Sequence, residues 1–113
     1  MTETIFSKII NREMDADIVY EDDDCLAFRD INPQAPVHIL LIPKKPIERL
    51  ATADSADADL LGHMMLKAGD IARDQGCGDA FRLVTNSGEG AGQSVFHLHF
   101  HILGGRALGW PPG

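Results

Sequence analysis

Three histidines, His97, His99 and His101, lie at alternate positions in a segment that reads His-Leu-His-Phe-His-Ile-Leu. The alternation of apolar and other residues runs from 95 to 103, which predicts a β-strand. Side chains along a strand alternate between its two faces, so the imidazoles would share one face and the apolar side chains the other. The apolar face suits a core. Three imidazoles on one face offer metal ligands, nucleophiles, acids or bases.

Metal ligation and metal-free imidazole chemistry are the two functional interpretations of this segment. Alternate strand residues lie about 6.6 Å apart and the outer two about 13 Å apart, whereas Zn–N bonds are about 2.1 Å, so one ion cannot bind all three histidines. His97 and His99 together with His38 could still offer three nitrogens, which leaves a metal-dependent hydrolase as an alternative. The sequence shows no groups that would orient the ligands of a catalytic zinc. We therefore expect no metal and no cofactor.

A glycine-rich loop precedes the histidines, from Asn86 to Ser94. Its alternate glycines, the last of which is Gly92, permit positive φ angles and a close approach of the backbone to an anion. Gln93 and Ser94 add hydrogen-bond donors beside the imidazoles. The loop lacks the Lys-Ser/Thr pair of a Walker A motif and leads into a strand, so it is neither a P-loop nor a dinucleotide fingerprint. It predicts either a long hairpin turn or a cradle for a small anion.

Apolar periodicity predicts the elements that must position these groups. A short amphipathic helix begins near Thr4, and a longer one runs from 55 to 75. Strands are expected at 18–20, 25–28, 37–42, 81–85 and 95–103, with an acidic turn at 21–24 and a stop at Pro43. The order, one helix, three strands, one helix and two strands, favours an antiparallel α+β fold over a doubly wound one.

The chain has 113 residues and a formal net charge of −7, which fits one acidic domain spanning 1–113. Acidity disfavours nucleic acid and anionic membranes as partners, because both select basic patches. Cys25 and Cys77 form no paired motif, so neither a disulfide framework nor a cysteine-only zinc site is expected. The N-terminus lacks the basic start of a signal peptide, and no apolar stretch approaches the roughly 20 residues of a membrane span. A cytoplasmic location is expected.

The histidine motif, preceded by Gly-Gln-Ser and followed by Gly-Gly-Arg, resembles the histidine triad (HIT) family. Segments at 5–10, 28–36, 38–45 and 110–113 are similar to its Hint branch, the histidine triad nucleotide-binding proteins. The resemblance implies a HIT-like fold, a five-stranded antiparallel sheet with two helices, and a homodimer in which the two sheets join. It also implies a metal-independent purine nucleoside 5′-phosphoramidase, or nucleotidyl hydrolase. Such an enzyme forms a covalent nucleotidyl-histidine and releases a nucleoside monophosphate such as AMP.

The resemblance further implies roles for individual residues. His99 would be the nucleophile and His101 a donor to the phosphate, with His97 and His38 orienting the site and relaying protons. Phosphate and leaving group would be surrounded by Asn86, Gly92, Gln93 and Ser94. The base pocket would be lined by Phe6, Ile9, Phe28 and Ile31, and Asp30 would bind the ribose hydroxyls. Trp110 would approach the site of the partner subunit.

Without the resemblance, several of these residues have simpler interpretations. The apolar ones are ordinary core residues, Asp30 suits a turn or cap, and His38 suits a satisfied core histidine. His63 lies away from the apolar stripe of its helix and is expected at the surface. A nucleotide-binding or scaffold protein without catalysis is a further alternative.

Overall fold

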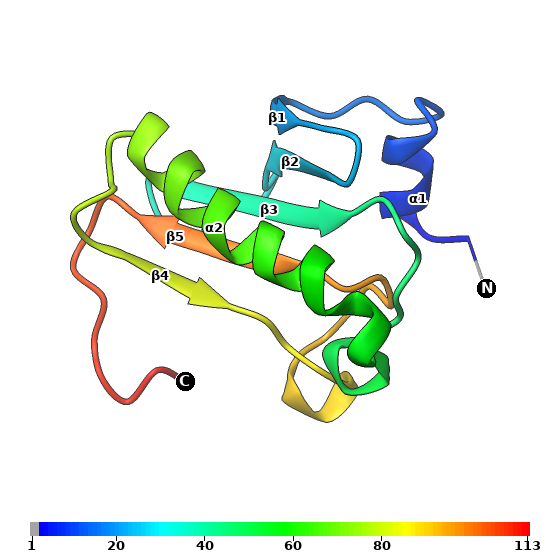
Figure 1. The fold of residues 1–113 in the computed structure, drawn as a ribbon. Helices are drawn as coiled ribbons and strands as arrows, with labels where there is room; N and C mark the ends of the chain where they lie inside the picture. Colours follow the sequence, from blue (N-terminus) through cyan, green and yellow to red (C-terminus); the bar gives the residue numbers. More distant parts are fainter. Residues whose placement is uncertain (1–2) are drawn as a thin grey trace.

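The computed structural model describes residues 3–113 and is built on one antiparallel sheet (Figure 1). The strands are β1 (Ile18–Glu21), β2 (Cys25–Arg29), β3 (Val37–Pro43), β4 (Phe81–Val84) and β5 (Phe100–Gly104). Their spatial order is β1-β2-β3-β5-β4, and each neighbouring pair is antiparallel. Two α-helices, α1 (Ile5–Ile10) and α2 (Ala58–Asp74), accompany the sheet. The predicted α+β fold, with five antiparallel strands and two helices, is confirmed.

The two faces of the sheet carry separate apolar clusters, one against each helix. In β3, Ile39 and Leu41 join the cluster under α2, while Leu40 and Ile42 join the cluster that contains Phe6 of α1. Coverage on both faces explains why the sequence of β3 is almost continuously apolar. Each such side chain contributes about 1.5–3 kcal/mol on full burial. His38 lies on the α1 face of this strand, between apolar neighbours.

Helix α1 is short, and its ends are specified locally. Thr4 is the N-cap, with a reciprocal capping box between Thr4 and Ser7, so the predicted start near Thr4 is confirmed. Six residues are too few for a stable isolated helix. Burial of Phe6 and Ile9 against the sheet therefore holds α1 in place.

Helix α2 crosses the opposite face of the sheet (Figure 1). The predicted helix at 55–75 consists of a 3₁₀ turn (Ser55–Asp57) followed by α2 (Ala58–Asp74). Its buried residues are Met64, Ala68, Ile71 and Ala72. Met65 is 55% exposed, and the next residue, Leu66, is 76% exposed. Among residues 3–113, no helix is long and apolar enough to cross a membrane.

The predicted strand at 95–103 is wrong in its first half, because β5 begins only at Phe100. The backbone N–H of Leu98 donates to the carbonyl of Ile47, and the Thr85 hydroxyl donates to the carbonyl of His99, in place of a strand ladder. On one side, pairing to β5 ends where Val84 meets His101. The alternation still separates the two faces, because Leu98, Phe100 and Ile102 all join the cluster under α2.

Candidate active site

Four imidazoles gather on the α1 face of the sheet. His38 comes from β3 and His101 from β5, and His38 Nε2 lies 2.9 Å from His101 Nδ1. The His99 and His101 rings have centroids 5.0 Å apart. The Phe6 ring of α1 packs edge-on against the His99 ring at 4.9 Å. The structure therefore brings His38, His97, His99 and His101 into one cluster, although His97 and His99 precede the strand.

His99 has its tautomer fixed by the backbone. Its Nδ1 lies 2.8 Å from the carbonyl oxygen of His97, and since a carbonyl only accepts, Nδ1 carries the proton. Nε2 is left with a free lone pair. Burial lowers the pKa of His99 below the ordinary histidine value. A neutral imidazole with a free nitrogen lone pair is a competent nucleophile near pH 7.

His38 and His101 form a directed hydrogen-bond chain. The backbone N–H of Gln34 donates to His38 Nδ1 at 3.0 Å, so in the neutral ring the proton sits on Nε2 and is donated to His101 Nδ1. His101 then keeps its own proton on Nε2. Burial is the main cause that lowers the pKa of His101 to about 4, and the nearby His99 and His38 add to it. His101 thus offers an N–H donor while remaining uncharged.

Two further residues, Asp30 and His97, belong to the surroundings of these histidines. Asp30 Oδ2 is 3.4 Å from His38 Nε2, and Asp30 Oδ1 accepts from the backbone N–H of Asn32. His97 is 2% exposed, and its Nε2–H donates to the carbonyl of Pro43 at 2.8 Å. Burial lowers the pKa of both His97 and His38. His97 thereby fixes the carbonyl that orients His99.

A cavity of about 280 Å³ lies beside the imidazoles. Its predicted lining residues are Phe6, Ile9, Phe28, Asp30, Ile31, Ser94, His99 and His101. Ile31 is fully exposed at the rim, whereas Phe6, Ile9 and Phe28 are buried. A concave apolar wall with a few polar groups at one end suits a small organic ligand.

Several residues of this wall were missed from the sequence: Ile5, Met14, Asp15, Ala16, Arg29, Leu40 and Val95. Leu40 had a usable signal, because it follows His38 by two residues in a strand and so shares its face. Residues 14–16 form a connection without apolar periodicity, and no pattern indicated them.

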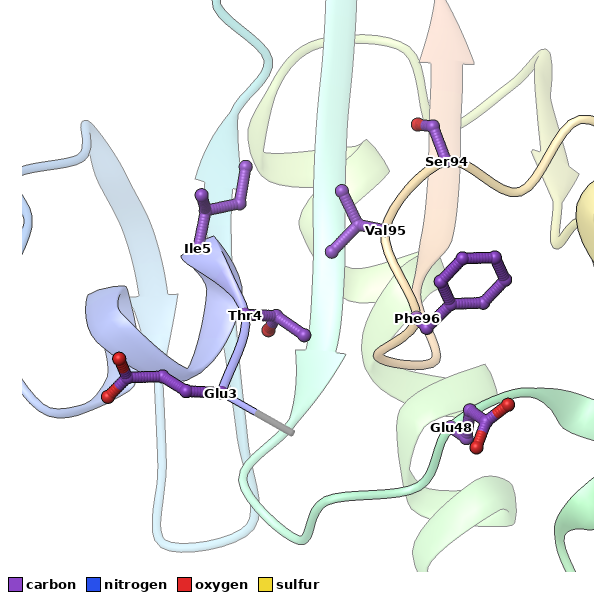
Figure 2. A pocket seen from close by; sticks show the side chains of 7 residues that line it. All are labelled: Glu3, Thr4, Ile5, Glu48, Ser94, Val95 and Phe96. Atoms are coloured by element: carbon purple, nitrogen blue, oxygen red, sulfur yellow. The ribbon is translucent and has the colours of Figure 1, made fainter. Parts of the chain in front are cut away.

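A second, wider hollow of about 610 Å³ adjoins this cavity (Figure 2). Ile5, Ser94 and Val95 line both, so the two spaces meet at the start of α1 and the loop that leads to β5. Figure 2 shows Glu48 and Phe96 across this hollow from Glu3 and Thr4. Ser94 is therefore the predicted site residue at the junction of the two spaces.

The glycine-rich loop is organised by Gln93, whose side chain is 2% exposed. Gln93 Oε1 accepts from the N–H of Gly88, and Nε2 donates to the carbonyls of Glu48 and Val95. Gly92 has a φ of 102°, a region that favours glycine. A Cβ at Gly92 would lie 3.7 Å from Asn86 Nδ2, so these residues are neighbours. Asn86, Gly92 and Gln93 do not line either cavity.

Trp110 lies apart from this cluster and is 82% exposed. Arg82 Nη2 donates to the carbonyl of Gly109 at 2.7 Å, which ties the C-terminal segment to edge strand β4. Trp110 lines neither cavity.

The site also contains one potential metal-ligand set. Asp30, His38 and His101 place ligand atoms within 4.8 Å of one another. Among residues 3–113 the proposed set of His97, His99 and His38 does not assemble in this way. Backbone carbonyls already engage His97 Nε2 and His99 Nδ1, so each of these rings has only its other nitrogen left for an ion.

Comparison with known proteins gives the class of this fold and site. The HIT domain family model matches residues 11–108. An uncharacterised HIT-like protein from Synechocystis sp. is 66% identical over 111 residues, which cover 98% of this chain and 97% of that protein. The chain belongs to the HIT family, and the family resemblance seen in the sequence is confirmed.

Solved structures agree with this assignment. The crystal structure of a HIT family hydrolase from Legionella pneumophila matches with a TM-score of 0.96 and 45% identity, covering 98% of this chain and all (100%) of that one. A hypothetical histidine triad nucleotide-binding protein from Sulfolobus tokodaii matches with a TM-score of 0.76 and 42% identity, covering 88% of this chain and 67% of that one.

Proposed function

We propose that this protein hydrolyses purine nucleoside 5′-phosphoramidates through a covalent nucleotidyl-histidine formed on His99. The observation that carries the proposal is the hydrogen bond from His99 Nδ1 to the His97 carbonyl, which leaves Nε2 free in a neutral ring beside the cavity. The similarity to a HIT family hydrolase and to a hypothetical histidine triad nucleotide-binding protein supports the same class of reaction.

The nucleotide would enter with its base in the apolar end of the 280 Å³ cavity, among Phe6, Ile9, Phe28 and Ile31. Asp30 lines the same cavity and lies 3.4 Å from His38 Nε2, and its carboxylate can accept hydrogen bonds from ribose hydroxyls. The α-phosphate would then lie beside His99 and His101. The leaving group would point past Ser94 into the second hollow.

The reaction would proceed in two displacements. His99 Nε2 attacks the α-phosphorus, a P–N(His) bond forms, and the P–N bond to the leaving amine breaks as that amine takes up a proton from Ser94 or a histidine. Water then attacks the phosphorus of the nucleotidyl-histidine, and the P–N(His) bond breaks. The water gives its proton back to the group that protonated the amine, and the nucleoside monophosphate leaves with His99 restored. His101 Nε2–H would stabilise charge on an equatorial oxygen, since it is fixed before the reaction by His38.

The remaining predicted residues receive positioning roles in this proposal. Gln93 holds the loop 88–95 through three hydrogen bonds to backbone groups. Asn86 and Gly92 would shape the same loop around the phosphate and leaving group. His97 would fix the tautomer of His99 through its carbonyl.

The homodimer belongs to the same proposal. Strand β4 is an edge strand, and an apolar hollow of about 370 Å³ lies beside it. The hollow is lined by Leu50, Leu61, Met65, Leu83, Thr85 and Phe100. A second copy of the chain would pair with β4 and cover this surface. Trp110 would then reach the partner's site from the segment tied to β4.

The direct test is incubation with adenosine 5′-phosphoramidate, with AMP release followed by chromatography. Acid quenching in the first turnovers should trap a phosphorus-bearing adduct on a peptide that contains His99, and His99→Ala should abolish both adduct and turnover. An active His99→Ala variant would overturn the role of His99. Loss of activity on exhaustive chelation would support the metal-dependent alternative, and absence of turnover with any nucleotide ester or amide would support a scaffold.

A further inference from the structure

A second cluster of ionisable side chains lies on the opposite face of the sheet, under α2. It consists of Asp22 in the β1–β2 turn, Cys25 at the start of β2 and His63 in α2. Asp22 Oδ2 lies 2.7 Å from His63 Nε2 and 3.6 Å from Cys25 Sγ. The Tyr20 hydroxyl donates to the same oxygen at 2.6 Å. Three donors therefore converge on one carboxylate oxygen, which has about two acceptor sites.

The backbone fixes the carboxylate at the centre of this cluster. Asp22 Oδ1 accepts from the N–H groups of Asp24 and Cys25, both at 2.8 Å. Cys25 is fully buried, whereas the side chains of Asp22 and His63 are 23% and 33% exposed. The cluster therefore has a preformed inner side and an outer side open to solvent.

We propose that Asp22, Cys25 and His63 form a binding site for a divalent transition-metal ion of the zinc type, separate from the imidazole cluster. One thiol sulfur, one imidazole nitrogen and one carboxylate oxygen are all ligands of zinc. The three ligand atoms lie within 4.8 Å of one another. Zinc bonds of about 2.0–2.3 Å put tetrahedral ligands about 3.3–3.8 Å apart, so shifts of about 1 Å assemble the set.

Charge and protons are consistent with a cation at this position. The turn at 21–24 is Glu-Asp-Asp-Asp, and of these acids Glu21 is paired with Lys44 and Arg12. Lys67 Nζ lies 5.5 Å from the centroid of the Tyr20 ring. On binding, the Cys25 thiol gives its proton to solvent. The His63 proton that now faces Asp22 moves from Nε2 to Nδ1, and water supplies the fourth ligand. Binding would tie the β1–β2 turn to α2 through metal bonds in place of hydrogen bonds.

Cobalt(II) is the probe, because a thiolate ligand gives cobalt a near-ultraviolet charge-transfer band that nitrogen and oxygen ligands do not. Reduced wild-type protein should bind one equivalent of cobalt with this band, and zinc should displace it. Cys25→Ser should lose the band. His63→Ala, a change on a half-exposed helix position, should weaken binding of both ions at least about tenfold.

Two control variants separate this site from others in the chain. Cys77→Ser removes the second buried cysteine and should keep the band, and His101→Ala should also keep it, because the group of Asp30, His38 and His101 contains no thiol. A wild-type protein without the band, or a band that survives in Cys25→Ser, would overturn the proposal. If Cys25→Ser does not fold by circular dichroism, His63→Ala decides: unchanged affinity in that variant would equally overturn it.

Discussion

His38 gives the sharpest test of the active-site reasoning, through the variant His38→Phe. The phenyl ring keeps most of the volume of a side chain that is 4% exposed, but it removes the 2.9 Å hydrogen bond to His101 Nδ1. His101 can then carry its proton on either nitrogen, and the donor at Nε2 is no longer fixed. Hydrogen bonds to charged groups are worth about 1.5–3 kcal/mol. The expected fall in kcat is therefore about 10-fold to 150-fold.

The assay is steady-state release of AMP from adenosine 5′-phosphoramidate, with kcat and KM measured separately. KM should change little, because His38 does not line the 280 Å³ cavity. His101→Ala and the double variant complete a cycle, and the two losses should be strongly non-additive because both remove the same donor. If kcat of a folded His38→Phe variant stays within twofold of wild type, the hydrogen bond from His38 to His101 has no role in the reaction. His38 would then be a core residue.

Further predictions concern pH, the loop and the proposed dimer. Burial lowers the pKa of all four site histidines, that of His101 to about 4, so kcat/KM should stay level through pH 6.5 and fall only at lower pH; a midpoint at 6.5 would contradict this. Between about pH 6.5 and 4 the unfolded chain binds more protons than the folded one, so the free energy of unfolding should decrease as the pH falls. The decrease is at most about 1.4 kcal/mol per pH unit for each histidine. Urea unfolding at constant ionic strength measures this free energy, and a flat profile would show that these histidines titrate alike in both states. Gln93→Leu removes the hydrogen-bond partner of three backbone groups. It should lower the free energy of unfolding by about 1–3 kcal/mol and also lower kcat. An unaltered melting temperature would mean that the loop keeps its conformation without the Gln93 side chain. Met65→Lys places a charge on the exposed apolar face of α2 and should halve the molar mass measured by light scattering. Leu66→Lys is the comparison at the neighbouring position. A wild-type protein that is itself monomeric would contradict the proposed dimer.

The fold was largely predictable, because its elements carry local signals. Thr4 marks the start of α1, Pro43 ends β3, and the apolar run of β3 required cover on both faces. The exception is the segment 95–99, whose alternation is as regular as that of β5. Whether an alternating segment becomes a strand depends on partners, and here Thr85 and Ile47 supply hydrogen bonds that no local pattern contains.

The active site was predictable in its residue types but not in its geometry. Alternation correctly separated Leu98, Phe100 and Ile102 from the imidazoles. The tautomer of His97 depends on the carbonyl of Pro43, which is 54 residues away in the chain. Those of His38 and His99 depend on backbone groups four and two residues away, whose approach requires a backbone conformation that residue types do not specify. Gln93 also depends on a distant backbone group, because its side chain joins Gly88 and Val95 of its own loop to the carbonyl of Glu48, 45 residues away. Sequence patterns report side-chain types, whereas these contacts are made with the backbone.

The imidazole cluster and the cluster of Asp22, Cys25 and His63 illustrate what decides the chemistry of an imidazole in this fold. His99 donates to a backbone carbonyl, which fixes its proton without adding a negative charge, and burial keeps the ring neutral. His63 instead faces the carboxylate of Asp22 at a half-exposed position beside a thiol. A neutral partner favours a nucleophile, whereas a carboxylate and a thiol favour a cation. What differs is the group that accepts the hydrogen bond from each ring, a carboxylate for His63 and a backbone carbonyl for His99. Replacing that carboxylate by Asp22→Asn should therefore abolish cobalt binding at His63, while the proposed AMP release at His99 continues.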